Sequence, residues 1–263
     1  MRNKRDGSVQ SVSRAVDLLE ALSDGEEHGV TELGKQLRVH KATASRLLAT
    51  LAQRRLVYRN PATDKYRLGL GLIHLAGSAM AGIDLIGQAR PILEDLAATT
   101  SETVNLAVLD GNQVMHVDQI AGTRNIVNVS WVGRRTPLHC TANGKVLLAF
   151  LEAPERDRML APPLEALTGN TITSRRKLER QLTEIRGRGY ARAIEELEDG
   201  LNVVAAPVRG ADGGVVAAVS VGGPAFRMRP RELGKLGRMA MDAGAAISRR
   251  MGFVKGRRSN GST

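Results

Sequence analysis

The feature that most constrains the fold is the pattern of residues 41–53, which separates into a buried stripe and a small, polar face. Ala44, Leu47, Leu48 and Leu51 recur at helical spacing and form the stripe. The opposite face carries hydroxyl groups, alanines and an arginine. A helix in the major groove needs small side chains for close approach, hydroxyls for phosphates and arginine for base edges. This segment therefore predicts a recognition helix for double-stranded DNA.

The segments around it complete a winged helix-turn-helix. Residues 9–23 have helical periodicity, and a short helix with Thr31 as its N-cap is expected next. Residues 56–59 and 65–68 alternate around a turn-rich loop, which predicts a β-hairpin. The residues expected to contact DNA are Lys41, Thr43, Ser45, Arg46, Thr50, Arg59, Lys65 and Arg67.

The charge distribution agrees with a polyanionic partner. The chain has 263 residues and a formal net charge of +11. The excess lies at the two ends, with a net +5 in residues 1–75 and again in residues 249–263, while the middle is nearly neutral. Clustered basic charge suits DNA, because each neutralised phosphate releases counterions.

The rest of the chain predicts a second domain of the α+β class. Leu70 to Ala81 is expected to form a linker helix, and a helix from about Asp84 to Thr99 should kink or break near Ala89-Arg90, because Pro91 falls inside it. Further strands are expected at residues 103–108, 113–117, 124–132, 203–208 and 215–221, and further helices at residues 142–151, 178–187 and 230–250. Hairpin strands with interspersed helices indicate an antiparallel sheet.

No catalytic or metal-binding motif stands out in this second domain. His139-Cys140 is the only plausible nucleophile pair, but no third group is evident to orient it. The acidic cluster Glu195, Glu196, Glu198 and Asp199 is interpreted as a solvated turn. The histidines lack metal-ligand spacing, so neither a metal nor a cofactor is expected. An enzyme that uses Cys140 or the acidic cluster remains an alternative.

The sequence also predicts a cytoplasmic protein with no membrane association. No apolar run is long enough for a membrane-spanning helix, and polar residues follow the basic N-terminus where a signal peptide would have its apolar core. A sequence-tolerant DNA-binding protein is a third reading, which the nearly neutral middle of the chain disfavours.

The chain resembles the IclR family of bacterial transcriptional regulators from Val9 to about Arg250. The resemblance depends on several segments taken in order, namely 9–15, 43–48, 66–69, 137–145, 189–191, 205–208 and 220–224. It implies a ligand-responsive regulator, most often a repressor of a catabolic operon, that binds operator DNA as a homodimer or homotetramer. It also implies a GAF-like effector-binding domain that senses a small organic acid and has no catalytic residues.

The resemblance divides the chain into five parts. They are a basic N-terminal tail (1–8), a winged helix-turn-helix DNA-binding domain (9–69), a linker helix (70–83), an effector-binding domain (84–250) and a basic C-terminal tail (251–263).

By the same resemblance, backbone amides of Ala142 and Asn143 would receive the carboxylate of the effector at a helix N-terminus. The expected effector-binding residues are Met115, Ala142, Asn143, Ala193, Leu201, Val203, Ser220 and Gly222. Among the wall positions transferred from the family only Ser220 is polar, which favours a larger or more apolar acid. The effector, the operator, and the choice between repression and activation stay open.

Overall fold

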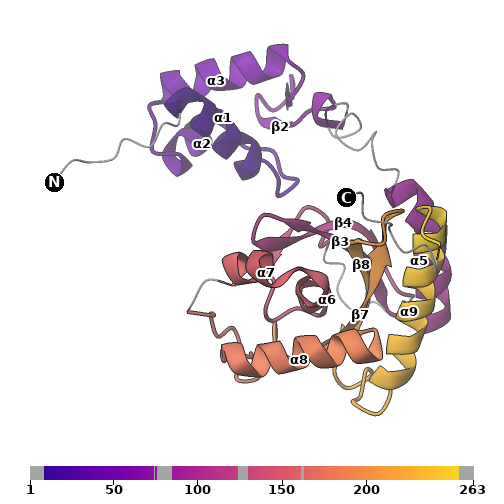
Figure 1. Cartoon of the computed structure of the whole chain (residues 1–263). Coiled ribbons are helices and arrows are strands. Elements are labelled where there is room, and N and C mark those ends of the chain that lie inside the picture. Colours follow the sequence, from indigo (N-terminus) through magenta and orange to yellow (C-terminus); the bar gives the residue numbers. More distant parts are fainter. Residues whose placement is uncertain (1–8, 74, 76–84, 124–129, 161–162, 255–263) are drawn as a thin grey trace, which may run out of the picture. The chain divides into compact units, whose positions relative to one another are not determined.

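The computed structural model describes residues 9–73, 75, 85–123, 130–160 and 163–254. The chain divides into two compact units between Asp84 and Leu85 (Figure 1). Each unit has its own hydrophobic core. The basic N-terminal tail and most of the expected linker helix lie outside the described residues, as does the C-terminal tail beyond residue 254.

The N-terminal unit is a winged helix-turn-helix. Helices α1 (Gln10–Ala21), α2 (Val30–Gln36) and α3 (Lys41–Gln53) precede the antiparallel strands β1 (Val57–Arg59) and β2 (Tyr66–Leu68). Leu18, Leu33, Leu48 and Val57 pack together in its core. The predicted helical stripe of α3 is confirmed, because Ala44, Leu48 and Leu51 are buried and Leu47 is partly buried.

The predicted start of α2 is wrong by two residues. Its N-cap is Gly29, and Thr31 is the second residue of the helix. The carboxylate of Glu32 accepts a hydrogen bond from the amide of Gly29, so the helix is capped from within its first turn. The residue before this N-cap, His28, also pairs with the wing, since His28 and Tyr66 exchange both backbone hydrogen bonds at 2.8 and 2.9 Å.

The C-terminal unit is built on an antiparallel sheet in the order β5-β4-β3-β8-β7-β6. Its central strands are β3 (Thr103–Asp110), β8 (Val215–Pro224) and β7 (Leu201–Arg209), and β4 (Gln113–Ile120) pairs with the outer side of β3. The edge strands β5 (Arg135–Pro137) and β6 (Ala191–Ile194) are shorter, and the sequence patterns did not predict either of them.

Helices cover both faces of this sheet (Figure 1). Helices α5 (Leu85–Thr100) and α9 (Leu233–Arg250) pack on one face, and α6 (Ala142–Phe150) and α8 (Arg175–Arg188) contribute to the core on the other. The short helix α7 (Ala153–Met159) was not predicted. No helix of the described residues is both long and apolar enough to cross a bilayer.

Two further expectations need correction or stay open. The helix α5 does not break near Pro91; it continues without interruption to Thr100 because Ala89, Leu93 and Leu96 anchor it in the core on both sides of the proline. Most of the strand expected at residues 124–132 lies outside the described residues, and residues 130–132 are irregular.

Candidate functional site

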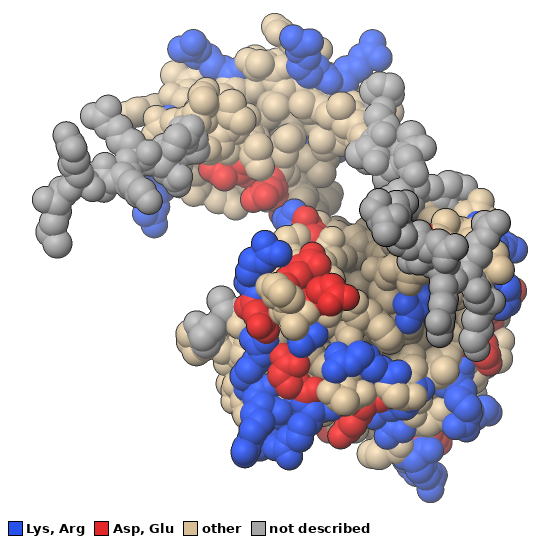
Figure 2. Space-filling view, viewed as in Figure 1, with Lys and Arg blue, Asp and Glu red and all other residues tan. Residues whose placement is uncertain are grey.

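The predicted DNA-contacting face of α3 is exposed. Lys41, Ser45, Arg46 and Thr50 are exposed, and Thr43 is half-buried. Arg46 has no ion-pair partner among the described residues, while the hydroxyl of Thr50 donates to the carbonyl of Arg46 at 2.9 Å. Figure 2 shows basic side chains along the edge of the N-terminal unit where Figure 1 draws α3. The helix therefore presents a basic surface to which the phosphates of DNA would bind favourably.

The wing is held in place by a carboxylate that the sequence patterns did not reveal. Glu27 accepts hydrogen bonds from the side-chain amide of Asn60 at 2.8 Å and from the hydroxyl of Thr63 at 2.7 Å. These bonds lower the pKa of Glu27, the amide of Asn60 most of all. They join the wing loop to the segment before α2, across more than thirty residues of sequence.

The three predicted wing cations are exposed, and two of them have partners. Arg59 forms an ion pair with Asp64 at 2.5 Å, and the guanidinium of Arg67 lies 4.8 Å from the ring centroid of Tyr58. Lys65 is exposed as well. The contact with Tyr58 orients the exposed guanidinium of Arg67, which suits contact with a phosphate.

A cavity of about 450 Å³ opens in the C-terminal unit, on the face of the sheet that α6 covers. Its wall includes seven of the eight predicted effector-binding residues, namely Ala142, Asn143, Ala193, Leu201, Val203, Ser220 and Gly222. These come from α6 and three different strands, so the fold brings together positions spread over eighty residues.

Met115 does not line this cavity. Successive side chains of a strand point to opposite faces, and in β4 it is His116 that faces the cavity. The prediction for Met115 was therefore displaced by one residue, which reverses the face of the sheet.

The first turn of α6 forms one end of the cavity. Thr141 is the N-cap, and its hydroxyl accepts from the amide of Gly144 at 3.1 Å and donates to the carbonyl of Pro137 at 2.8 Å. The amides of Ala142 and Asn143 have no hydrogen-bond partner within the described part of the chain. Two free amides at the positive end of a helix are favourable for an anion.

The cavity wall is more polar than the sequence indicated. Besides Ser220 it includes Asn105 and His116, both more than nine-tenths buried. Burial lowers the pKa of His116 to about 4, so its imidazole is neutral at pH 7. Its Nδ1 and the Oδ1 atoms of Asn105 and Asn143 are buried and have no partner among the described residues. Three unsatisfied polar groups around one cavity favour a ligand that supplies hydrogen bonds.

The charged groups of the wall are partly neutralised inside the protein. Glu102 and Arg227 form a two-pronged ion pair with both N···O distances at 2.8 Å. Trp131 borders the cavity, its ring lies 5.6 Å from that of His116, and the guanidinium of Arg134 lies 5.6 Å from the Trp131 ring. Sequence patterns missed all of these residues, because none belongs to a motif.

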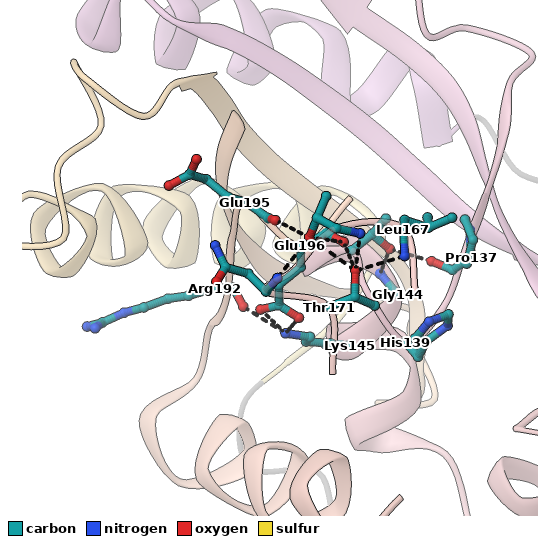
Figure 3. Close-up of polar contacts among 12 residues, drawn as sticks. Pro137, His139, Gly144, Lys145, Leu167, Thr171, Arg192, Glu195 and Glu196 are labelled. Atoms are coloured by element: carbon teal, nitrogen blue, oxygen red, sulfur yellow. Dashed lines mark hydrogen bonds and ion pairs between the residues drawn. The ribbon is translucent and has the colours of Figure 1, made fainter. Parts of the chain in front are cut away.

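The acidic cluster does not form a solvated turn throughout. Glu196 is 5% exposed, and both of its carboxylate oxygens lie 2.5 Å from Nζ of Lys145, which is fully buried in α6 (Figure 3). Lys145 therefore points away from the cavity and toward Glu196. Glu198 and Asp199 of the same loop are exposed and border the cavity.

Cys140 has the environment of a wall residue. Its thiol is buried, and burial, assisted by the charge of Glu196, raises its pKa to about 12. The neighbouring His139 is turned elsewhere, with Nε2 2.8 Å from the carbonyl oxygen of Glu165. A thiol with such a pKa holds almost no thiolate at neutral pH, so it is a poor nucleophile. Within the described residues, no group of acidic, histidine and cysteine side chains could hold a metal ion.

A winged helix-turn-helix and a separate unit with a cavity lined by both polar and apolar side chains define a DNA-binding regulator that responds to a small ligand. Comparison with known families agrees with this class. Residues 11–61 match the model described as the IclR helix-turn-helix domain, and residues 77–249 match that of the bacterial transcriptional regulator IclR C-terminal domain. The chain belongs to the IclR family of transcriptional regulators, which are not enzymes.

Individual relatives cover nearly the whole chain. It is 34% identical to the HTH-type transcriptional regulator KdgR of Escherichia coli over 252 residues, which are 95% of this chain and 96% of that protein. It is 30% identical to the HTH-type transcriptional repressor AllR of Klebsiella pneumoniae, over 93% of this chain and 91% of AllR. A crystal structure of an IclR homolog complexed with 4-hydroxybenzoate, from Microbacterium hydrocarbonoxydans, matches with a TM-score of 0.82 and 26% identity, over 92% of this chain and 98% of that one.

Proposed function

We propose that this regulator represses a catabolic operon. In this proposal it binds double-stranded operator DNA as a homodimer or homotetramer, and a small carboxylic acid in the cavity changes its DNA affinity. The DNA contacts are made by α3 and the wing, through Lys41, Thr43, Ser45, Arg46, Thr50, Arg59, Lys65 and Arg67. The similarity to AllR, a transcriptional repressor, supports repression as the direction of regulation.

The observation that carries the proposal is the pair of free amides at the start of α6. They lie in the wall of a cavity of about 450 Å³, a volume suited to a small organic molecule. A carboxylate on the amides of Ala142 and Asn143 would gain two charge-assisted hydrogen bonds and the favourable end of the helix dipole. The neighbour solved with 4-hydroxybenzoate holds an acid of this kind.

The strand residues of the cavity wall favour hydroxyl groups on the body of the acid. Asn105 and His116 line the cavity with polar atoms that no described residue satisfies, and Ser220 already accepts from Nδ2 of Asn143 at 3.1 Å. A hydroxyl can donate to a carboxamide oxygen or to an unprotonated imidazole nitrogen. The effector in this proposal is therefore a hydroxylated carboxylic acid rather than a purely apolar one.

Linkage limits how strongly the acid can act. A ligand changes DNA affinity only by the difference between its affinities for the DNA-bound and free conformations of the protein. Couplings of this kind are typically about 1–3 kcal/mol, which corresponds to roughly 5- to 150-fold.

The test is a gel-shift titration of the purified protein on the DNA upstream of its own gene. Matched acids with and without hydroxyls, 4-hydroxybenzoate against benzoate and D-gluconate against hexanoate, are added at moderate salt. The proposal predicts specific DNA binding whose affinity responds more strongly to a hydroxylated member than to its partner. Specific DNA binding that no acid of the panel alters would contradict the proposed effector class.

A further inference from the structure

The buried ion pair between Lys145 and Glu196 joins two parts of the cavity wall. Nζ of Lys145 lies 2.5 Å from both carboxylate oxygens of Glu196 and 3.3 Å from the carbonyl oxygen of Arg192. Lys145 is 0% exposed and Glu196 is 5% exposed. Three acceptors therefore surround one ammonium group in a site without solvent (Figure 3).

Such a pair is a costly way to stabilise a fold. Both charges lose their hydration on burial, and replacing a buried pair by apolar side chains of similar volume is often neutral or stabilising. Apolar side chains could fill the same space. The pair is therefore better explained by the geometry that its short, directed contacts impose on the residues around it.

The two partners sit next to the two halves of the proposed effector site. Lys145 is the fourth residue of α6. It follows Asn143, whose amide is free, by two residues. Glu196 belongs to the loop 195–200, which supplies Leu197, Glu198, Asp199 and Gly200 to the cavity wall. The ion pair thus links the anion-binding end of the cavity to the loop that borders it.

Further hydrogen bonds hold the backbone of this loop, whereas the ion pair holds the side chain of Glu196. The hydroxyl of Thr171 donates to the carbonyl of Glu196 at 2.6 Å, and the hydroxyl of Thr168 donates to the carbonyl of Glu195 at 2.6 Å (Figure 3). The amide of Gly200 is bound by the carboxylate of Glu195 at 2.8 Å. Through its ion pair with Lys145, Glu196 connects this loop to α6.

We propose that Lys145 and Glu196 are a positioning pair that sets effector affinity by holding the loop 195–200 against the start of α6. Neither side chain contacts the effector. Loss of the pair lets the loop move away from the cavity, so the cavity opens more often and the effector dissociates faster. The proposal rests on the cavity being the effector site.

The decisive variant is the double substitution Lys145→Met/Glu196→Leu, which removes both charges and keeps most of the volume. Single substitutions would leave a buried charge without a partner and risk unfolding the unit. The control is Arg156→Met/Glu179→Leu, which removes both charges of a less buried ion pair of 3.2 Å between α7 and α8 that does not line the cavity. Thermal unfolding of both variants reports on stability alone.

Two native side chains report on the cavity without added labels. Cys140 is the only cysteine of the chain and Trp131 its only tryptophan, and both line the cavity. Alkylation of Cys140 by iodoacetamide measures how often the wall opens, and Trp131 fluorescence measures binding of 4-hydroxybenzoate. Glu196 raises and Lys145 lowers the pKa of Cys140, so alkylation is compared over a range of pH to separate access to the thiol from its thiolate content.

The double variant is expected to unfold near the wild-type temperature, to bind DNA normally without acid, and to alkylate at least about tenfold faster. Its affinity for 4-hydroxybenzoate should fall by a similar factor, within the range of allosteric couplings. The control variant should match wild type in both assays. A folded double variant with wild-type alkylation and affinity would overturn the positioning role. A wild-type protein whose DNA binding responds to no acid would instead contradict the proposed function, and the alkylation rates would still decide whether the pair holds the loop.

Discussion

At the scale of single residues, Arg46 is the side chain whose exposure most directly indicates a DNA contact. It lies on the exposed face of α3 and has no ion-pair partner within the described residues, so its removal leaves the core untouched. We expect Arg46→Ala to weaken operator binding by about 1–3 kcal/mol, the usual worth of an arginine contact to DNA. Gel shifts at moderate salt measure this.

Arg180→Ala is the matched control for Arg46→Ala, because it removes the same charge from an exposed position of α8 in the other unit. It should leave DNA affinity unchanged. Equal affinities of wild type and Arg46→Ala for the operator would remove Arg46 from the interface.

His116 predicts a pH dependence of stability. Burial lowers its pKa to about 4, below the 6.5 of an exposed histidine. As the pH falls below 6.5, the unfolded chain takes up a proton that the folded state does not, so the free energy of unfolding decreases until about pH 4. Between pH 7.5 and 5.0 this contribution amounts to about 2 kcal/mol.

The measurement is urea unfolding followed by Trp131 fluorescence at these two pH values, for wild type and His116→Gln. The variant cannot take up the proton, so its free energy of unfolding should decrease by about 2 kcal/mol less between pH 7.5 and 5.0. Identical losses in the two proteins would show that His116 is not the group responsible.

At the scale of elements, the start of α6 offers a test that separates backbone from side chain. Proline is tolerated in the first turn of a helix, where its missing amide has no helical partner. Asn143→Pro should therefore keep α6 but remove one amide of the proposed anion site, whereas Asn143→Ala removes only the side chain and its bond to Ser220.

We expect Asn143→Pro to abolish the acid response in the gel shift while operator binding without acid persists. Asn143→Ala should keep a response, reduced by the loss of one neutral hydrogen bond of about 1 kcal/mol. If Asn143→Pro responds like Asn143→Ala, the carboxylate does not bind at the backbone amides.

At the scale of the whole molecule, the exposed apolar residues near the end of the N-terminal unit predict self-association. Leu70, Ile73 and Leu75 are 78%, 67% and 54% exposed, at the start of the expected linker helix. Burying such side chains against a second copy would be favourable, and symmetric operators need paired recognition helices about 34 Å apart or a multiple of that distance. We expect a dimer or tetramer.

Light scattering at micromolar concentration tests the assembly directly. A monomer has a mass of 28.3 kDa, so a dimer or tetramer is easily distinguished. Leu70→Glu/Ile73→Glu should shift the mass toward the monomer and weaken operator binding. A wild-type mass near 28 kDa would contradict the paired arrangement.

The elements that could be predicted without a structure are those whose sequence signals are local. The helical stripe of α3 and the alternating hairpin strands depend on spacings of a few residues, which the backbone converts directly into a buried and an exposed face. The antiparallel hairpin of β3 and β4 follows from two alternating runs around a turn at Gly111, which adopts a positive φ. The position of the cavity was predicted from the family resemblance of the segment around Asn143.

Which side chains complete that cavity depends on contacts between residues far apart in the chain. Lys145 and Glu196 are 51 residues apart, and Asn143 and Ser220 are 77 apart, so no periodicity relates them. Met115 and His116 are neighbours, and no local pattern distinguishes which of them faces the cavity. The register of β4 in the sheet directs His116, and not Met115, toward the cavity. The sequence does not distinguish Glu196 from the other three acidic residues of its cluster. In the folded protein it is buried beside the ammonium group of Lys145. The burial and the contacts of these side chains depend on long-range packing, which the local spacing of residues does not predict.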